Sequence, residues 1–105
     1  LGQHDLALQE YNLWYESSLR NSNKLSPSLL EILDDYVQFR RGLTYASLNR
    51  HDNAIADYQR IFNKSNRLIS STIADRIFFR QGMSSMALND AHDALINFNK
   101  SISLN

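Results

Sequence analysis

The strongest constraint on the fold is an internal repeat of 40 residues. When residues 26–65 are aligned with residues 66–105, seven of the 40 aligned pairs are identical. A third, incomplete copy opens the chain, in which Leu1, Ala7 and Tyr11 keep the spacing of a leucine, an alanine and an aromatic residue in both later copies. A fixed period of this length is typical of stacked copies of one supersecondary unit. The identical pairs are Asp35/Asp75, Phe39/Phe79, Arg40/Arg80, Gly42/Gly82, Leu48/Leu88, Asn49/Asn89 and Ala54/Ala94.

The repeat predicts how the chain is organised. We expect one domain over residues 1–105, consisting of a half repeat at 1–25, a repeat at 26–65 and a repeat at 66–105. The length suits a single domain. Because the chain opens on leucine within a repeat, we interpret it as a piece of a longer protein.

Each full repeat is expected to form two helices. The sequence has only three glycines and one proline, which favours an all-α chain without strands. Ser26 and Pro27 form a good helix start, and the polar segment Ser17–Leu25 is predicted to be the main loop. Asn66 and Ser70 are candidate caps for the fourth helix. The five predicted helices, arranged antiparallel, cover residues 4–19, 27–48, 52–63, 68–88 and 91–104.

The longer helix of each repeat needs neighbours on two sides. In the first full repeat, apolar residues recur at helical spacing on two opposite faces, so the paired short helix can cover only one of them. Gly42 and Gly82 lack a side chain in mid-helix, and we expect Ala54 and Ala94 to face them across a close helix contact. The two apolar faces are formed by Leu29, Leu33, Val37, Thr44 and Leu48 and by Ile32, Tyr36, Phe39 and Leu43.

Composition excludes several classes of function. Eleven basic side chains balance eleven acidic ones, which disfavours binding to nucleic acid. An RNA-binding helical array, in which Tyr, Phe and Arg side chains stack on the bases, stays an alternative. The absence of cysteine excludes disulfides and thiolate sites. No apolar run approaches the length of a membrane span, and no signal-peptide pattern is present. We therefore expect a cytoplasmic protein.

Three His-Asp pairs are the only pattern that suggests a metal or catalytic site. They begin at His4, His51 and His92, all in turns before short helices. Equivalent turns of stacked helices lie about 8–10 Å apart per helix, too far for three ligands to meet at one metal ion. An aspartate also suits a helix N-terminus. With no catalytic motif elsewhere, we expect no metal, no cofactor and no enzymatic activity.

The spacing Gly42-x2-Tyr45, followed by Ala54-x3-Tyr58, resembles the tetratricopeptide repeat. The second copy is similar, but Ser85 replaces the tyrosine and the period is 40 residues rather than the usual 34 or so. The resemblance implies an all-α fold of antiparallel helix-turn-helix repeats, stacked as a short solenoid. It also implies a non-enzymatic module that binds a peptide or a partner protein.

The resemblance further implies a concave groove formed by the first helix of each repeat. Arg76 and Arg80 are similar to the two basic positions of the carboxylate clamp, with which co-chaperones hold the acidic C-terminal tails of heat-shock chaperones. Arginine suits this role because its planar fork binds a carboxylate through two hydrogen bonds. Arg40 stands where the clamp has an asparagine. The residues expected to line the groove and bind the partner are Tyr36, Phe39, Arg40, Arg76, Phe79, Arg80 and Met83.

Two alternatives stay open from the residues alone. Asp34, Asp35 and Asp75 could pair with the groove arginines and leave no charge for a ligand. The repeats could also serve as a structural scaffold or self-associate, because apolar residues at the chain end have no capping helix after them. These apolar residues are Ile96, Ile102 and Leu104.

Overall fold

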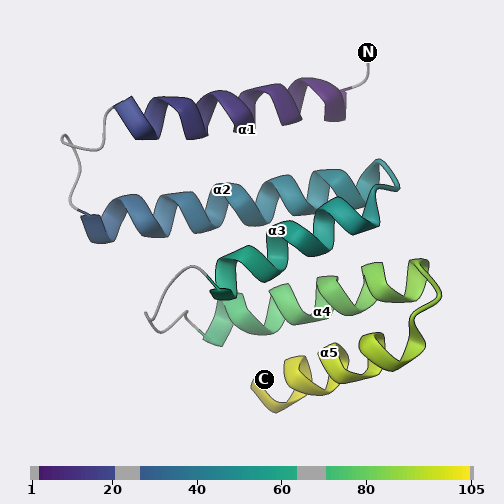
Figure 1. The fold of residues 1–105 in the computed structure, drawn as a ribbon. Helices are drawn as coiled ribbons and strands as arrows, with labels where there is room; N and C mark the ends of the chain where they lie inside the picture. The colour runs from purple at the N-terminus through teal and green to yellow at the C-terminus, as the bar shows by residue number, and fades with distance from the viewer. Residues whose placement is uncertain (1–2, 21–26, 64–70, 105) are drawn as a thin grey trace.

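The computed structural model describes residues 3–20, 27–63 and 71–104, and these form helices and short turns without a strand (Figure 1). The prediction of an all-α chain with five helices is confirmed for this part. The helices are α1 (Gln3–Arg20), α2 (Pro27–Ser47), α3 (His51–Asn63), α4 (Ser71–Ala87) and α5 (Ala91–Leu104).

The predicted helix bounds agree closely with the structure, except around the first loop. Helix α1 continues to Arg20, so the loop predicted from Ser17 begins too early. The polar residues there lower helix propensity only slightly, and the packing of α1 against α2 outweighs that cost. The predicted start of the fourth helix at residue 68 and its candidate caps, Asn66 and Ser70, lie outside the described residues.

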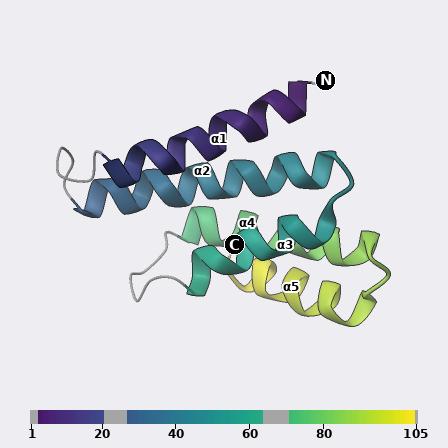
Figure 2. The same cartoon turned by 45° about the horizontal axis from the view of Figure 1, so that its top comes forward.

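Consecutive helices run antiparallel and pack side by side in a flat slab of 42 × 37 × 17 Å (Figures 1 and 2). Each helix contacts the next one along the chain. In addition, α2 and α4 approach each other directly, past the shorter helix between them. This places the long helices of the two full helix pairs on a common face.

Identical turns fix the two helix pairs in the same geometry. Asn49 and Asn89 adopt the left-handed conformation, with φ of 61° and 62°. Asparagine tolerates this conformation better than most residues. After each asparagine, one backbone amide closes the turn: Arg50 donates to the carbonyl of Tyr45 at 2.8 Å, and the second turn repeats this bond at 2.9 Å. As a result, α3 folds back on α2 as α5 folds back on α4.

The mid-helix glycines admit an aromatic ring, and the atoms nearest to each glycine belong to that ring rather than to Ala54 or Ala94. A Cβ atom at Gly82 would lie 2.6 Å from Cε1 of Phe98, and a Cβ at Gly42 would meet the ring of Tyr58 in the same way. Tyr58 and Phe98, each four residues after the alanine of its short helix, lie over the glycines, because their longer side chains reach back and fill the space. The alanines are buried beside these rings.

A buried ion pair joins the first three helices. Arg41 donates from Nη2 to Oδ1 of Asp57 at 2.7 Å and from Nε to Oδ2 at 2.9 Å. Its third polar contact is to Oδ1 of Asn12 at 3.0 Å, and its guanidinium lies 4.9 Å from the ring centre of Tyr15. The hydrogen bonds to Asp57 raise the pKa of Arg41. Arg41 therefore holds both α1 and α3 against α2.

Candidate functional site

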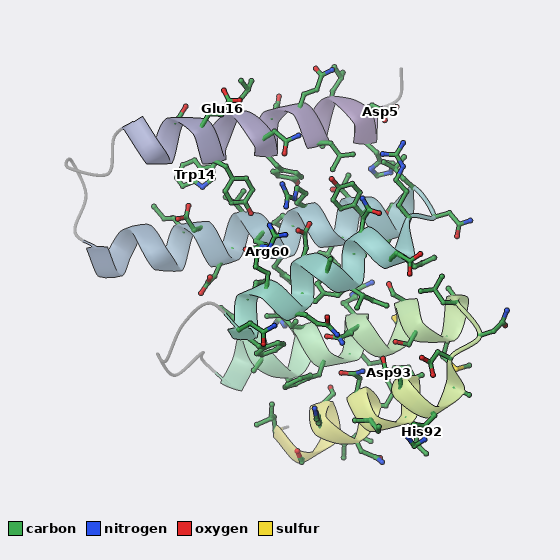
Figure 3. The ribbon with its side chains drawn as sticks, in the orientation of Figure 1. Asp5, Trp14, Glu16, Arg60, His92 and Asp93 are labelled. Atoms are coloured by element: carbon green, nitrogen blue, oxygen red, sulfur yellow. The ribbon has the colours of Figure 1, made fainter. Side chains whose placement is uncertain are left out.

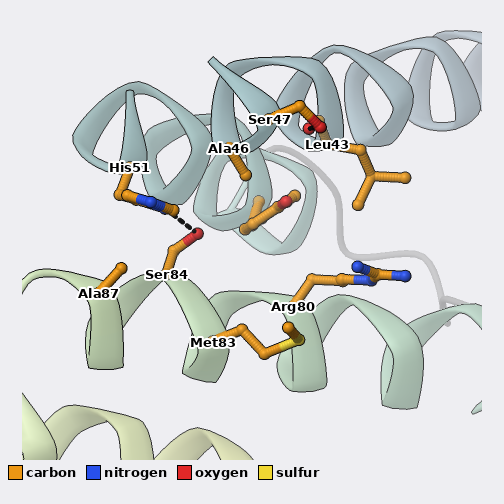
Figure 4. A pocket seen from close by; sticks show the side chains of 9 residues that line it. Leu43, Ala46, Ser47, His51, Arg80, Met83, Ser84 and Ala87 are labelled. Atoms are coloured by element: carbon orange, nitrogen blue, oxygen red, sulfur yellow. Dashed lines mark hydrogen bonds between the residues drawn. The ribbon is translucent and has the colours of Figure 1, made fainter. Parts of the chain in front are cut away.

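Two adjoining hollows lie between α2 and α4, one bordered by α5 and the other by α3. They share two lining residues, Leu43 and Arg80. The first, the arginine hollow, has a volume of about 490 Å³ and is lined by Phe39, Arg40, Leu43, Asp75, Arg76, Phe79, Arg80 and Ser101. The second, the tyrosine hollow, has a volume of about 520 Å³ and is lined by Leu43, Ala46, Ser47, His51, Tyr58, Arg80, Met83, Ser84 and Ala87 (Figure 4).

The structure brings five of the seven predicted site residues to the arginine hollow: Phe39, Arg40, Arg76, Phe79 and Arg80. They meet because their positions recur at the 40-residue spacing on two adjacent long helices. Met83 lines the neighbouring tyrosine hollow, one turn beyond Phe79. Tyr36 lines neither hollow, but it is exposed on the same face of α2, one turn before Arg40.

The three arginines of the arginine hollow carry no ion pair within the described residues. Arg40, Arg76 and Arg80 are all exposed, and the ion pair found in this part of the chain joins Arg41 to Asp57. Within the same part of the chain, no ion pair joins Asp34 or Asp75 to these arginines. Asp34, for example, accepts a hydrogen bond at 2.9 Å from Nε1 of Trp14, which points from α1 toward α2 (Figure 3). Gathered positive charge of this kind attracts an anion.

Two aromatic rings give the arginine hollow an apolar floor. The ring of Phe39 lies 6.0 Å from that of Tyr58, and the ring of Phe79 lies 5.7 Å from that of Phe98. Each ring is thus held by the short helix of its own pair, while Phe79 keeps 47% of its surface exposed. A ligand in the hollow would meet apolar surface next to arginine side chains.

The tyrosine hollow contains groups that the sequence analysis did not assign to the site. Nδ1 of His51 and Oγ of Ser84 lie 3.0 Å apart and join α3 to α4 (Figure 4). The hydroxyl of Tyr58 is buried and has no hydrogen-bond partner among the described residues. Burial raises the pKa of Tyr58 to about 12, so the hydroxyl keeps its proton at neutral pH. The sequence held one signal for this hydroxyl: Tyr58 in the first full repeat aligns with Phe98 in the second.

The described residues hold no group of three or more His, Asp or Glu side chains suited to a metal ion. His51 forms a hydrogen bond with Ser84. His92 lies at the start of α5 (Figure 3). Within the same part of the chain, none of the helices has the length and apolar character needed to cross a membrane.

Comparison with known proteins gives one family. The model of the tetratricopeptide repeat matches residues 36–63, which span the second half of α2, the following turn and all of α3. No curated protein and no solved structure was found to match the chain. The matched segment includes Gly42, Ala54 and Tyr58, whose spacing carries the resemblance. The match shows that residues 36–63 are similar to a tetratricopeptide repeat, and such repeats form protein–protein interaction modules that are typically not catalytic.

Proposed function

We propose that the arginine hollow binds an acidic segment of a partner protein. One observation carries this proposal: three exposed arginines without a carboxylate partner in the described chain lie beside two phenylalanine rings on one face. Three arginines and one aspartate line the hollow, which gives it a net formal charge of +2. Charges left unpaired in this way favour an anionic ligand over a neutral one.

The arrangement supports recognition by two kinds of contact. Each guanidinium can hold a carboxylate through paired hydrogen bonds, which fixes the orientation of the ligand. Phe39 and Phe79 provide apolar contact for the carbon chain of the same segment. Asp75, which also lines the hollow, would repel an acidic residue placed next to it and so set the register of the segment.

The acidic C-terminal tail of a heat-shock chaperone is the specific occupant that we propose. The support is the four-residue spacing of Arg76 and Arg80 on α4, both of which line the hollow. This occupant would make the protein a cytoplasmic co-chaperone. Arg40 adds a third positive charge where the carboxylate clamp has an asparagine, so we expect a more acidic tail than the clamp needs.

Replacing Arg80 with alanine should weaken the binding of an acidic peptide about tenfold to a hundredfold, because a hydrogen bond to a charged group contributes roughly 1.5–3 kcal/mol. Arg80→Lys should recover only part of the affinity, since the planar fork is lost. Isothermal titration calorimetry at low salt, with a peptide of about eight residues ending in Leu-Asp-Asp and a free carboxylate, measures this.

The matched control is Arg60→Ala, because Arg60 is an exposed arginine on α3 that lines neither hollow (Figure 3). It should bind the peptide as the wild type does. A second titration with a C-terminally amidated peptide separates a terminal carboxylate from acidic side chains. If the wild type and Arg80→Ala bind the peptide equally well, the arginine hollow is not the binding site.

A scaffold role is the second candidate, favoured by apolar side chains exposed on α5. Ile102 has 71% of its surface exposed, and Ile96 and Leu104 are exposed as well. Exposed apolar surface of this kind supports self-association. Sedimentation velocity separates the two functions, because association through α5 would rise with protein concentration and would not depend on Arg76 or Arg80.

A further inference from the structure

The hydroxyl of Tyr58 is a polar group that the fold itself does not use. The side chain has no exposed surface, and its hydroxyl has no hydrogen-bond partner among the described residues. A buried polar group without a partner lowers stability, and native proteins hold few of them. Its presence therefore calls for an explanation.

Packing does not supply that explanation. The ring of Tyr58 fills the space over Gly42 and contacts Phe39. In the second helix pair, the ring of Phe98 fills the space over Gly82 and contacts Phe79 in the same way, without a hydroxyl. Phenylalanine thus meets the same structural need in the same molecule, and the oxygen atom of Tyr58 is surplus to the packing.

The surroundings of Tyr58 define which ligand would suit its hydroxyl. Tyr58 and Arg80 line the same hollow, and Arg80 also lines the arginine hollow. Burial raises the pKa of Tyr58 to about 12, so at neutral pH both the phenol and the guanidinium are donors. The other polar pair nearby, His51 and Ser84, is already joined by its own contact. Two donors that line one hollow suit an acceptor between them, and a carboxylate accepts from both.

We propose that Tyr58 is a specificity-determining residue, whose hydroxyl donates a hydrogen bond to the carboxylate that Arg80 binds. This inference rests on the proposed function and names a further contact in the same site. Arg80 and Met83, the long exposed side chains of the tyrosine hollow, can move to admit the ligand. The hydroxyl then gains in the complex the partner that it lacks in the free protein.

The proposal predicts opposite effects of Tyr58→Phe on stability and on binding. Removing the unpartnered oxygen should raise the melting temperature by about 4–8 °C, the shift expected when a small domain gains roughly 1 kcal/mol. The same change should weaken binding of the Leu-Asp-Asp peptide about tenfold, because one hydrogen bond to a carboxylate is lost. Thermal unfolding followed by circular dichroism and titration calorimetry measure the two effects.

Two controls make the result specific. Tyr11→Phe removes a hydroxyl on α1, outside both hollows, and should leave the affinity unchanged. A peptide in which Asn replaces both Asp residues and the C-terminus is amidated should bind weakly, because it has no carboxylate for Tyr58 and Arg80 to bind. The peptide with an amidated C-terminus shows whether the carboxylate that Tyr58 meets is terminal or belongs to a side chain.

The outcomes separate this inference from the proposed function. If Arg80→Ala weakens binding but Tyr58→Phe binds as tightly as the wild type, the arginine hollow binds the peptide and the role of Tyr58 is overturned. If the wild type does not bind the acidic peptide at all, the proposed function fails, and the inference fails with it. Higher stability together with weaker binding supports both.

Discussion

Replacing Asp57 with alanine is expected to lower the free energy of unfolding by about 3–5 kcal/mol, because it leaves a largely buried guanidinium without its carboxylate. The side chains of Arg41 and Asp57 are only 14% and 3% exposed. Both oxygens of Asp57 accept hydrogen bonds from Arg41, so one substitution removes the contact that holds α3 against α2. Urea denaturation followed by circular dichroism measures the loss.

The second helix pair provides the control for this ion pair. At the equivalent positions it has two neutral amides, Gln81 and Asn97, which are both buried. The double variant Arg41→Gln/Asp57→Asn copies that arrangement and leaves no unpaired charge, so it should recover much of the stability lost in Asp57→Ala. A single Asp57→Ala variant as stable as the wild type would show that the ion pair contributes nothing to the stability of the packing of α3 against α2.

Replacing Ile77 with alanine is expected to destabilise the protein by about 2–5 kcal/mol, the usual cost of truncating a fully buried isoleucine. Ile77 lies on α4 with no exposed surface and packs against Tyr58 and Ile61 of α3. This contact joins one helix pair to the next. The substitution therefore leaves a cavity at the boundary between the two pairs, and urea denaturation reports its cost.

Ile102→Ala is the matched control, because it makes the same chemical change on α5 at a side chain that is 71% exposed. It should change the free energy of unfolding by no more than about 0.5 kcal/mol. Equal losses in the two variants would contradict the assignment of Ile77 to the core between the helix pairs.

The fold and most of the candidate site could be predicted because they depend on spacing. A 40-residue repeat that carries helical periodicity fixes the number and order of the helices. Residues at equivalent positions of α2 and α4, such as Phe39 and Phe79, then necessarily share a face. Arg40 and Arg80, which are also at equivalent positions, line one hollow.

The remaining features depend on side-chain directions between helices, which spacing does not give. The contact of Arg41 with Asp57 requires the angle at which α3 returns along α2. That Asp34 binds Trp14 rather than a groove arginine depends on where α1 lies. The side chain nearest to Gly42 is that of Tyr58 rather than that of Ala54, because the longer side chain reaches back along its helix.

The face that binds the partner is the central claim, and mapping the bound peptide by NMR tests it most directly. In a titration of the nitrogen-15-labelled protein with the Leu-Asp-Asp peptide, we expect the largest amide shifts at Phe39, Arg40, Arg76 and Arg80, on α2 and α4. A separate hollow between α3, α4 and α5 is lined by residues that include Phe62, Phe78 and Lys100. If the largest shifts occur there, while the amides of the arginine hollow do not move, the proposed binding face is wrong.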